Sequence, residues 1–186
     1  MNLTRWAIFP GVLFSSFMLV ILTGLISQPA MSAAAANNAS TTLPQLSGDC
    51  TIRPSYPTSV RQWCSLIERH AAKQNLDPNL VAAVILEESG GDAQVYSKSG
   101  AVGLMQVMPN DGIAAGFVCG DHPCFPSRPS TSDLLDPEFN IDYGTRLLSS
   151  LVQRNGNLRD ALKAYGPINV GYSYADAVIS ILTHYQ

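Results

Sequence analysis

One short stretch of the chain constrains its fold more than any other. Residues 80–86 (LVAAVIL) are apolar on every side of a helix, so this helix has to be buried on most sides. Asp77 and Pro78 suit its N-terminus, because an Asp side chain accepts from free N–H groups and Pro fits the first helical position. Two glutamates follow at residues 87–88, and two glycines at 90–91 end the helix. The sequence therefore predicts a central buried helix that carries carboxylates at its C-terminal end.

The remaining segments are also patterned mainly for helices. Apolar residues recur at spacings of three and four in a helix that we expect from Thr58 or Ser59, as its cap, to about Gln74. Residues 100–109 read as a glycine-marked turn that leads into a short apolar helix. Further helices are expected from Asp136–Pro137 to about residue 155, over 158–165 and over about 172–185. No run with strand periodicity is long enough to trust, so the fold class is mainly α with little or no sheet.

The four cysteines indicate disulfides rather than a metal site. All of them follow the N-terminal apolar run, and an even number in an exported chain favours pairing. Of three connectivities we favour Cys50–Cys64 and Cys119–Cys124, each worth about 2 to 3 kcal/mol in the chain-entropy model. The second bridge is expected to hold an irregular surface loop over residues 112–132. His122 lies between two cysteines, but the usual CxxC spacing is missing, so we predict no metal. We expect His70 at the surface or its boundary.

The N-terminus reads as a targeting segment. Arg5 precedes an apolar run over residues 6–26, and small residues follow over 29–36, which are the parts of a secretory signal. The run is also long enough to span a bilayer, so a membrane anchor stays open beside our preferred cleavage near residues 32–36. We expect a signal peptide or anchor over 1–33, a flexible linker over 34–49 and one domain over 50–186. That domain is then extracytoplasmic: secreted, periplasmic or associated with the cell wall.

The charge pattern excludes some functions and leaves one chemical candidate. A net charge of -3 with 13% charged residues gives no basic footprint for nucleic acid. The chain has neither a GxSxG elbow nor a P-loop. What remains is a carboxylate in apolar surroundings, which raises a Glu pKa from about 4.3 toward about 6 and suits it to general acid catalysis, for example of glycoside cleavage. Successive helical residues point about 100° apart, so Glu87 and Glu88 cannot face one spot. A solvated helix end is the alternative.

A longer pattern favours catalysis. Residues 88–109 (ESGGDAQVYSKSGAVGLMQVMP) resemble the signature of the soluble lytic transglycosylase (SLT) domain family, a relative of goose-type lysozyme. The likeness extends from about residue 57 to 185. It includes DPEFNIDYGTRLL at 136–148 and ALKAYG at 161–166. The resemblance implies a lysozyme-like, mainly α fold.

The resemblance also implies roles for single residues. The family's catalytic acid is the Glu directly before Ser, which is Glu88, and Glu87 is then an exposed or structural neighbour. Five residues match positions that line the substrate cleft: Ser97, Gln106, Met108, Tyr165 and Tyr174. Each has a plainer alternative, because Met108 and Tyr165 suit a core, Gln106 and Tyr174 suit packing, and Ser97 suits a turn. One departure stands out: the family's Ala-Tyr-Asn-Ala-Gly is replaced by Ala164-Tyr165-Gly166-Pro167, with Asn169 as a possible substitute for the asparagine.

The implied reaction needs one carboxylate and neither metal nor cofactor. Protonated Glu88 would donate to the glycosidic oxygen between N-acetylmuramic acid and N-acetylglucosamine in peptidoglycan. The same carboxylate would then take the proton of the sugar's 6-hydroxyl as a 1,6-anhydro ring closes. A lysozyme-like hydrolase that uses water is one alternative, and a glycan-binding module without turnover is another. The expected partner is the peptidoglycan glycan strand, with membrane contact only through an uncleaved N-terminus. Oligomeric state does not follow from the sequence.

Overall fold

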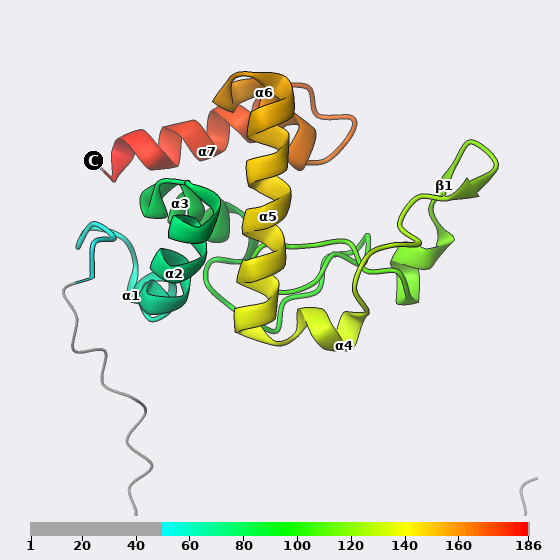
Figure 1. Ribbon diagram of the computed structural model, residues 1–186, viewed down its shortest axis with the longest axis horizontal. Helices are drawn as coiled ribbons and strands as arrows, with labels where there is room; N and C mark the ends of the chain where they lie inside the picture. Colours follow the sequence, from blue (N-terminus) through cyan, green and yellow to red (C-terminus); the bar gives the residue numbers. More distant parts are fainter. Residues whose placement is uncertain (1–49, 186) are drawn as a thin grey trace, which may run out of the picture. The chain divides into compact units, whose positions relative to one another are not determined.

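The computed structural model describes residues 50–185, which fold mainly into helices (Figure 1). The prediction of a mainly α class is confirmed, because the described part contains seven α-helices and one two-stranded hairpin. None of these helices is long and apolar enough to cross a membrane. The predicted signal or anchor (1–33) and linker (34–49) lie outside the described residues. The elements are α1 (Thr58–Arg61), α2 (Cys64–Gln74), α3 (Pro78–Ser89), the 3-10 helix η1 (Gly112–Gly116), β1 (Val118–Cys119), β2 (His122–Pro123), α4 (Thr131–Leu134), α5 (Pro137–Asn155), α6 (Leu158–Tyr165) and α7 (Ser173–His184).

Helix α3 forms the centre of the core, as its composition predicts. Every residue from Leu80 to Ile85 is buried, and α1, α2 and α7 pack around the helix. Its N-terminus has the predicted cap, because the Asp77 carboxylate accepts from the Asn79 N–H at 2.8 Å. Gly90, with φ +62°, ends the helix in the left-handed conformation. The acids at residues 87–88 therefore lie in the last turn of a helix that is fixed by packing.

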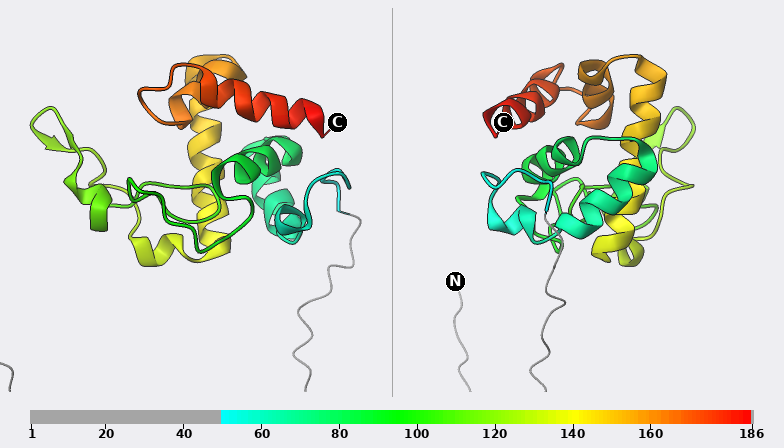
Figure 2. Two further views of the ribbon diagram at one scale, coloured as in Figure 1. Left: turned by 180° about the vertical axis from the view of Figure 1, so that it is seen from behind. Right: turned by 60° about the vertical axis from the view of Figure 1, so that its left-hand side comes forward.

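Helix α5 connects the two ends of the domain. It packs against α2, α4 and α6, and α6 in turn packs against α7. In Figures 1 and 2, α4 lies near one end of α5, while α6 and α7 lie at the other. The predicted cap at Asp136 is confirmed, since its carboxylate accepts from the Phe139 N–H at 2.7 Å, and Gly156 ends the helix.

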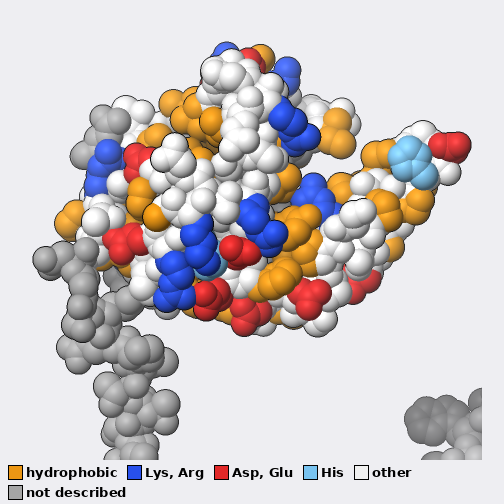
Figure 3. Space-filling view, in the orientation of Figure 1, with side chains coloured by type: hydrophobic (Ala, Val, Ile, Leu, Met, Phe, Trp, Pro, Cys, Tyr) orange, Lys and Arg blue, Asp and Glu red, His pale blue; other side chains and the backbone are white. Residues whose placement is uncertain are grey.

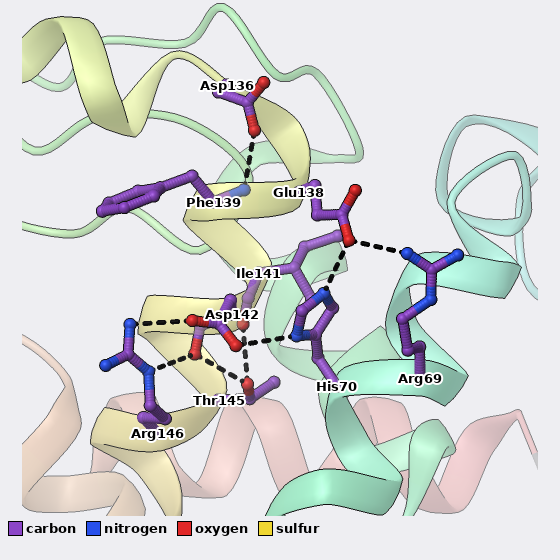
Figure 4. Close-up of polar contacts among 9 residues, drawn as sticks. All are labelled: Arg69, His70, Asp136, Glu138, Phe139, Ile141, Asp142, Thr145 and Arg146. Atoms are coloured by element: carbon purple, nitrogen blue, oxygen red, sulfur yellow. Dashed lines mark hydrogen bonds and ion pairs between the residues drawn. The ribbon is translucent and has the colours of Figure 1, made fainter.

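A buried histidine fastens α2 to the first turns of α5 (Figure 4). The expectation that His70 lies at the surface is wrong: the residue is 2% exposed. Its Nδ1 lies 2.9 Å from Asp142 Oδ1 and its Nε2 lies 3.4 Å from Glu138 Oε1. Arg69 pairs with Glu138 at 2.6 Å, and Arg146 pairs with Asp142 at 2.8 Å. The polar ring nitrogens are buried because two carboxylates of α5 satisfy them.

The helix expected from residue 58 to 74 is broken. Helix α1 ends at Arg61 and α2 begins at Cys64, and the cap position of α1 is Pro57, which makes no side-chain cap bond. The break directs the Trp63 indole N–H to the carbonyl of Gly91, at 2.9 Å. Thr58 and Ser59 are thus not the caps that were predicted.

Both favoured disulfides are present. One joins Cys50 to Cys64, so the entry of the chain is tied to the first residue of α2. The other joins Cys119 to Cys124 across the β1–β2 hairpin. The chain described here has no free cysteine between residues 50 and 185.

The hairpin and η1 form a projecting arm, which we define as residues 112–126 (Figure 1). The irregular loop expected over 112–132 is therefore partly regular, because it contains η1 and a two-stranded pairing and ends in α4. Hydrophobic side chains lie along the arm (Figure 3), and Ile113, Phe117 and Val118 are 64%, 41% and 65% exposed. The bridge and the pairing stabilise a segment that contributes little to the core.

Candidate active site

The candidate acid, Glu88, lies in the last turn of α3, next to a serine that anchors this end of the helix. The Ser89 hydroxyl lies 3.1 Å from the carbonyl oxygen of Ile85 and 2.9 Å from that of Leu104. It also accepts from the Gly91 N–H at 3.1 Å. The end of α3 is thereby bonded to the segment that follows it, and the Glu-Ser pair combines a candidate acid with the residue that fixes its position.

The segment over residues 95–108, called the motif segment below, folds as turns and not as the expected apolar helix. Val102 forms antiparallel bridges with Tyr96 and with Val107. Gly103 and Gln106 adopt φ of +76° and +45°, which an α-helix does not allow. The prediction failed because the apolar residues 104, 105 and 107 are buried by the surrounding helices and not by a helical face of their own.

A buried amide from α5 holds the motif segment in place. The Asn140 side chain accepts from the Met105 N–H at 2.8 Å and donates to the carbonyls of Val102 and Leu134, both at 2.9 Å. Asn140 is 0% exposed, and a Cβ at Gly103 would overlap it. The sequence reasoning assigned Asn140 no role, although the residue lies in the DPEFNI stretch that carries the resemblance. A lone Asn among apolar helix positions was the available signal.

Two tyrosines from the C-terminal helices close the other side of Glu88. The Tyr174 hydroxyl, on α7, donates to Glu88 Oε1 at 2.6 Å. The Tyr165 hydroxyl, at the end of α6, donates to the carbonyl of Met105 at 2.8 Å. The two rings stack with centroids 6.4 Å apart. The structure thus brings Glu88, Tyr165 and Tyr174 together, with Tyr174 in direct contact with the candidate acid.

The surroundings of Glu88 favour its protonated form near neutral pH. Burial raises the pKa of Glu88 from 4.5 to about 7, while the hydrogen bond from Tyr174 lowers it and the charge of Glu87 raises it. Burial, and then the negative charge of Glu88, raise the pKa of Tyr174, so this hydroxyl stays a donor. Glu87 is exposed, in agreement with the roughly 100° between successive helical residues. Of the two adjacent acids, Glu88 has the environment of a general acid.

The other predicted site residues make local contacts. The Ser97 hydroxyl accepts from the Ala101 N–H at 2.9 Å, and Gln106 donates to the carbonyls of Val95 and Gly103 at 3.1 and 3.0 Å. Met108 is half-buried. No hydrogen bond joins Ser97, Gln106 or Met108 to Glu88 within residues 50–185. The structure places these three on the motif segment and leaves their contact with a substrate as a prediction.

The departure at residues 164–167 has a structural counterpart. A Cβ at Gly166 would overlap the ring of Tyr174, so any side chain at this position conflicts with the observed place of the tyrosine. Asn169, the suggested substitute for the family's asparagine, is exposed. The glycine that replaces the family's asparagine therefore leaves the space that the Tyr174 ring occupies when its hydroxyl contacts Glu88.

Two further features do not belong to this site. One group of potential metal ligands comes together in the described part, namely Cys50, Cys64 and Glu68, but its sulfur atoms form a disulfide and thus offer no thiolate. A surface hollow of about 480 Å³ lies beyond the Gly90–Gly91 turn. It contains none of the predicted site residues; its lining is Ser59, Gln62, Trp63, Gly90, Gly91, Asp92, Ala93, Gln94 and Pro137.

Known proteins match the part of the chain that contains this site. The family model described as the transglycosylase SLT domain matches residues 65–174, which are more than half of the 186 residues. The chain belongs to the transglycosylase SLT domain family. The match begins in α2 and ends at Tyr174, so it includes every predicted site residue outside the disulfides.

Curated relatives and a solved structure are also similar to this chain. An endo-type membrane-bound lytic murein transglycosylase A from Klebsiella pneumoniae is 42% identical over 97 residues, which are 52% of this chain and 45% of that protein. A membrane-bound lytic murein transglycosylase E from Buchnera aphidicola is 32% identical over 100 residues, which are 54% of this chain and 44% of that protein. A structure of a lytic transglycosylase Slt from Pseudomonas aeruginosa, 25% identical, covers 65% of this chain and 23% of its own, with a TM-score of 0.49. The chain spans about half the length of the curated relatives it matches.

Proposed function

We propose that this SLT domain is a peptidoglycan lytic transglycosylase with Glu88 as its single catalytic acid and base. The observation that carries the proposal is the contact of a half-buried carboxyl, whose pKa is raised to about 7, with a tyrosine hydroxyl 2.6 Å away. A carboxyl with this pKa is partly protonated at neutral pH. It can therefore donate a proton to a glycosidic oxygen. Relatives whose names include lytic murein transglycosylase support the substrate class.

The reaction begins with proton donation by Glu88. Because Oε1 accepts the Tyr174 hydrogen bond, the acidic proton is carried by Oε2. Oε2 donates it to the oxygen between N-acetylmuramic acid and N-acetylglucosamine. The bond between this oxygen and the anomeric carbon of the muramic sugar then breaks. The substrate's own N-acetyl group stabilises the positive charge that develops at the anomeric carbon. The ionised Glu88 then takes the proton of the 6-hydroxyl, whose oxygen attacks the anomeric carbon and closes the 1,6-anhydro ring. The Tyr174 hydrogen bond stabilises the carboxylate between these two steps.

We further propose that the domain acts outside the cytoplasm. The N-terminal pattern of one charge, an apolar run and small residues supports export. Two disulfides support an oxidising compartment. Relatives named as membrane-bound are consistent with action at the cell envelope.

Digestion of purified peptidoglycan by the wild-type chain, followed by mass spectrometry of the fragments, tests the function. Anhydro ends are expected, whereas reducing ends would identify a hydrolase. Glu88→Gln is expected to lower the rate by about 1,000-fold, because the general acid is lost. Glu87→Gln is the matched control and is expected to retain most of the activity. Inactive wild type would make the domain a glycan-binding module, and loss of activity only in Glu87→Gln would assign the acid to the neighbour.

A further inference from the structure

An arginine that the proposed mechanism does not use lies near the tyrosine side of the site. Arg128 is half-buried in the connection between β2 and α4. Its backbone N–H donates to the carbonyl of Phe125 at 3.1 Å. Its guanidinium carbon lies 5.8 Å from the ring centre of Phe125 and 5.7 Å from that of Tyr143. Both rings contact the guanidinium by cation–π interactions and restrict this side chain.

Helix α5 contacts both this arginine and the motif segment. Tyr143 precedes Gly144, which lies so close to Met105 that a Cβ there would overlap the methionine side chain. The Met105 carbonyl accepts the Tyr165 hydroxyl. In agreement with this proximity, the positive charge of Arg128 lowers the pKa of Tyr165, against the larger raising effects of burial and of Glu88.

Arg128 is one of four arginines between residues 50 and 185 whose charge pairs with no carboxylate. Arg69, Arg146 and Arg159 each pair with a carboxylate, at 2.6, 2.8 and 2.7 Å. Within the described range the Arg128 guanidinium takes part in neither an ion pair nor a hydrogen bond. Five N–H donors beside the site are therefore available to a ligand.

We propose that Arg128 forms a subsite that binds a carboxylate on the 3-O-lactyl substituent of a muramic acid residue. The inference rests on the proposed function, because it assigns a part of that substrate to a residue. A strand without peptides presents the lactyl carboxylate itself, and a strand with peptides presents the peptide's carboxylates. The guanidinium fork matches a carboxylate in a bidentate geometry.

Binding measurements on the full chain with Glu88→Gln, which prevents turnover, test the subsite. Calorimetry compares three oligosaccharides of equal length: a neutral N-acetylglucosamine oligomer, a peptide-free muramic strand and a peptide-bearing strand. Arg128→Met keeps an apolar stem against the two rings and is expected to raise Kd about tenfold for a carboxylate-bearing strand, with no change for the neutral oligomer. Arg128→Lys keeps the charge without the fork and is expected to lose less.

Arg146→Met is the matched control, since Arg146 lies 5.3 Å from the same Tyr143 ring but is already paired with Asp142. It is expected to leave all three Kd values unchanged. A loss confined to the peptide-free strand assigns the lactyl carboxylate, and a loss confined to the peptide-bearing strand assigns a peptide carboxylate. Equal losses for all three ligands, no loss for any, or no binding of either muramic strand would overturn the inference. Wild type that releases no fragments while the Arg128-dependent binding persists would instead contradict the proposed reaction.

Discussion

The two sides of Glu88 are built in different ways. The side formed by α3 and the motif segment is buried, and Val102, Leu104 and Met105 are each 0% exposed. Hydrogen bonds from the side chains of Ser89 and Asn140 hold it in place. The side formed by α6 and α7 reaches Glu88 through one hydroxyl, and the connection between these helices is open, with Ile168 89% exposed. The first side fixes where the acid lies. The second adjusts its protonation and is the part that departs from the family pattern.

The largest effect, a loss of stability, is expected from removing the Asn140 amide, which holds the motif segment on the first side of Glu88. Asn140→Ala leaves the Met105 N–H and the carbonyl of Leu134 unpaired, whereas the Val102 carbonyl keeps the N–H of Val107. Because each unpaired buried group costs about 1 to 3 kcal/mol, we expect the free energy of unfolding to fall by about 3 kcal/mol. Urea denaturation measures the change, and activity should fall with it as the motif segment loosens.

Asn155→Ala is the matched control for this variant. Asn155 lies on the same helix, is exposed, and donates to the carbonyl of Leu151 at 2.8 Å. A surface substitution of this kind changes stability by only about 0.5 kcal/mol. If the two alanine variants lost equal stability, the buried amide would not be what holds the motif segment.

The helices were predictable because local signals agreed with tertiary packing. The Asp77–Pro78 and Asp136–Pro137 starts were confirmed, and the all-apolar run of α3 correctly indicated the centre of the core. The motif segment was wrongly given a helix, because buried apolar residues look alike in a turn and in a helix. His70 was misplaced because its burial depends on carboxylates about 70 residues further along the chain.

The site was only partly accessible from the sequence for a similar reason. Residue spacing separated Glu87 from Glu88, and the family pattern selected Glu88, but neither indicated how far burial raises its pKa. Asn140, which acts through contacts with residues more than 30 positions away, was missed, and Arg128 was not singled out. Gly166 was noted as a departure from the family pattern, but the sequence did not show that its lack of a side chain makes room for the Tyr174 ring.

A smaller and more local effect is expected on the tyrosine side. Gly166→Ala adds a Cβ that overlaps the Tyr174 ring, so the ring has to move and the hydrogen bond to Glu88 is lost or lengthened. We expect activity to fall about tenfold, the amount that corresponds to about 1.4 kcal/mol, with a much smaller stability change than for Asn140→Ala. Gly116→Ala is the control, because a Cβ there meets no atom within 4 Å. Equal activity of the two variants would show that the close approach at Gly166 is unimportant.

The smallest effects are shifts of the pH profile, and their signs distinguish the two sides. In the proposed mechanism protonated Glu88 is the reactive form, so kcat/KM should fall as pH rises through its pKa of about 7. Tyr174→Phe removes a hydrogen bond that favours the carboxylate, so the pKa of Glu88 rises and the fall moves to higher pH, even though the rate drops. Glu87→Gln removes a negative charge that favours the protonated form, so the fall moves to lower pH. Profiles of kcat/KM on soluble glycan measure both shifts, and shifts of the same sign in the two variants would mean that the profile reports a group other than Glu88.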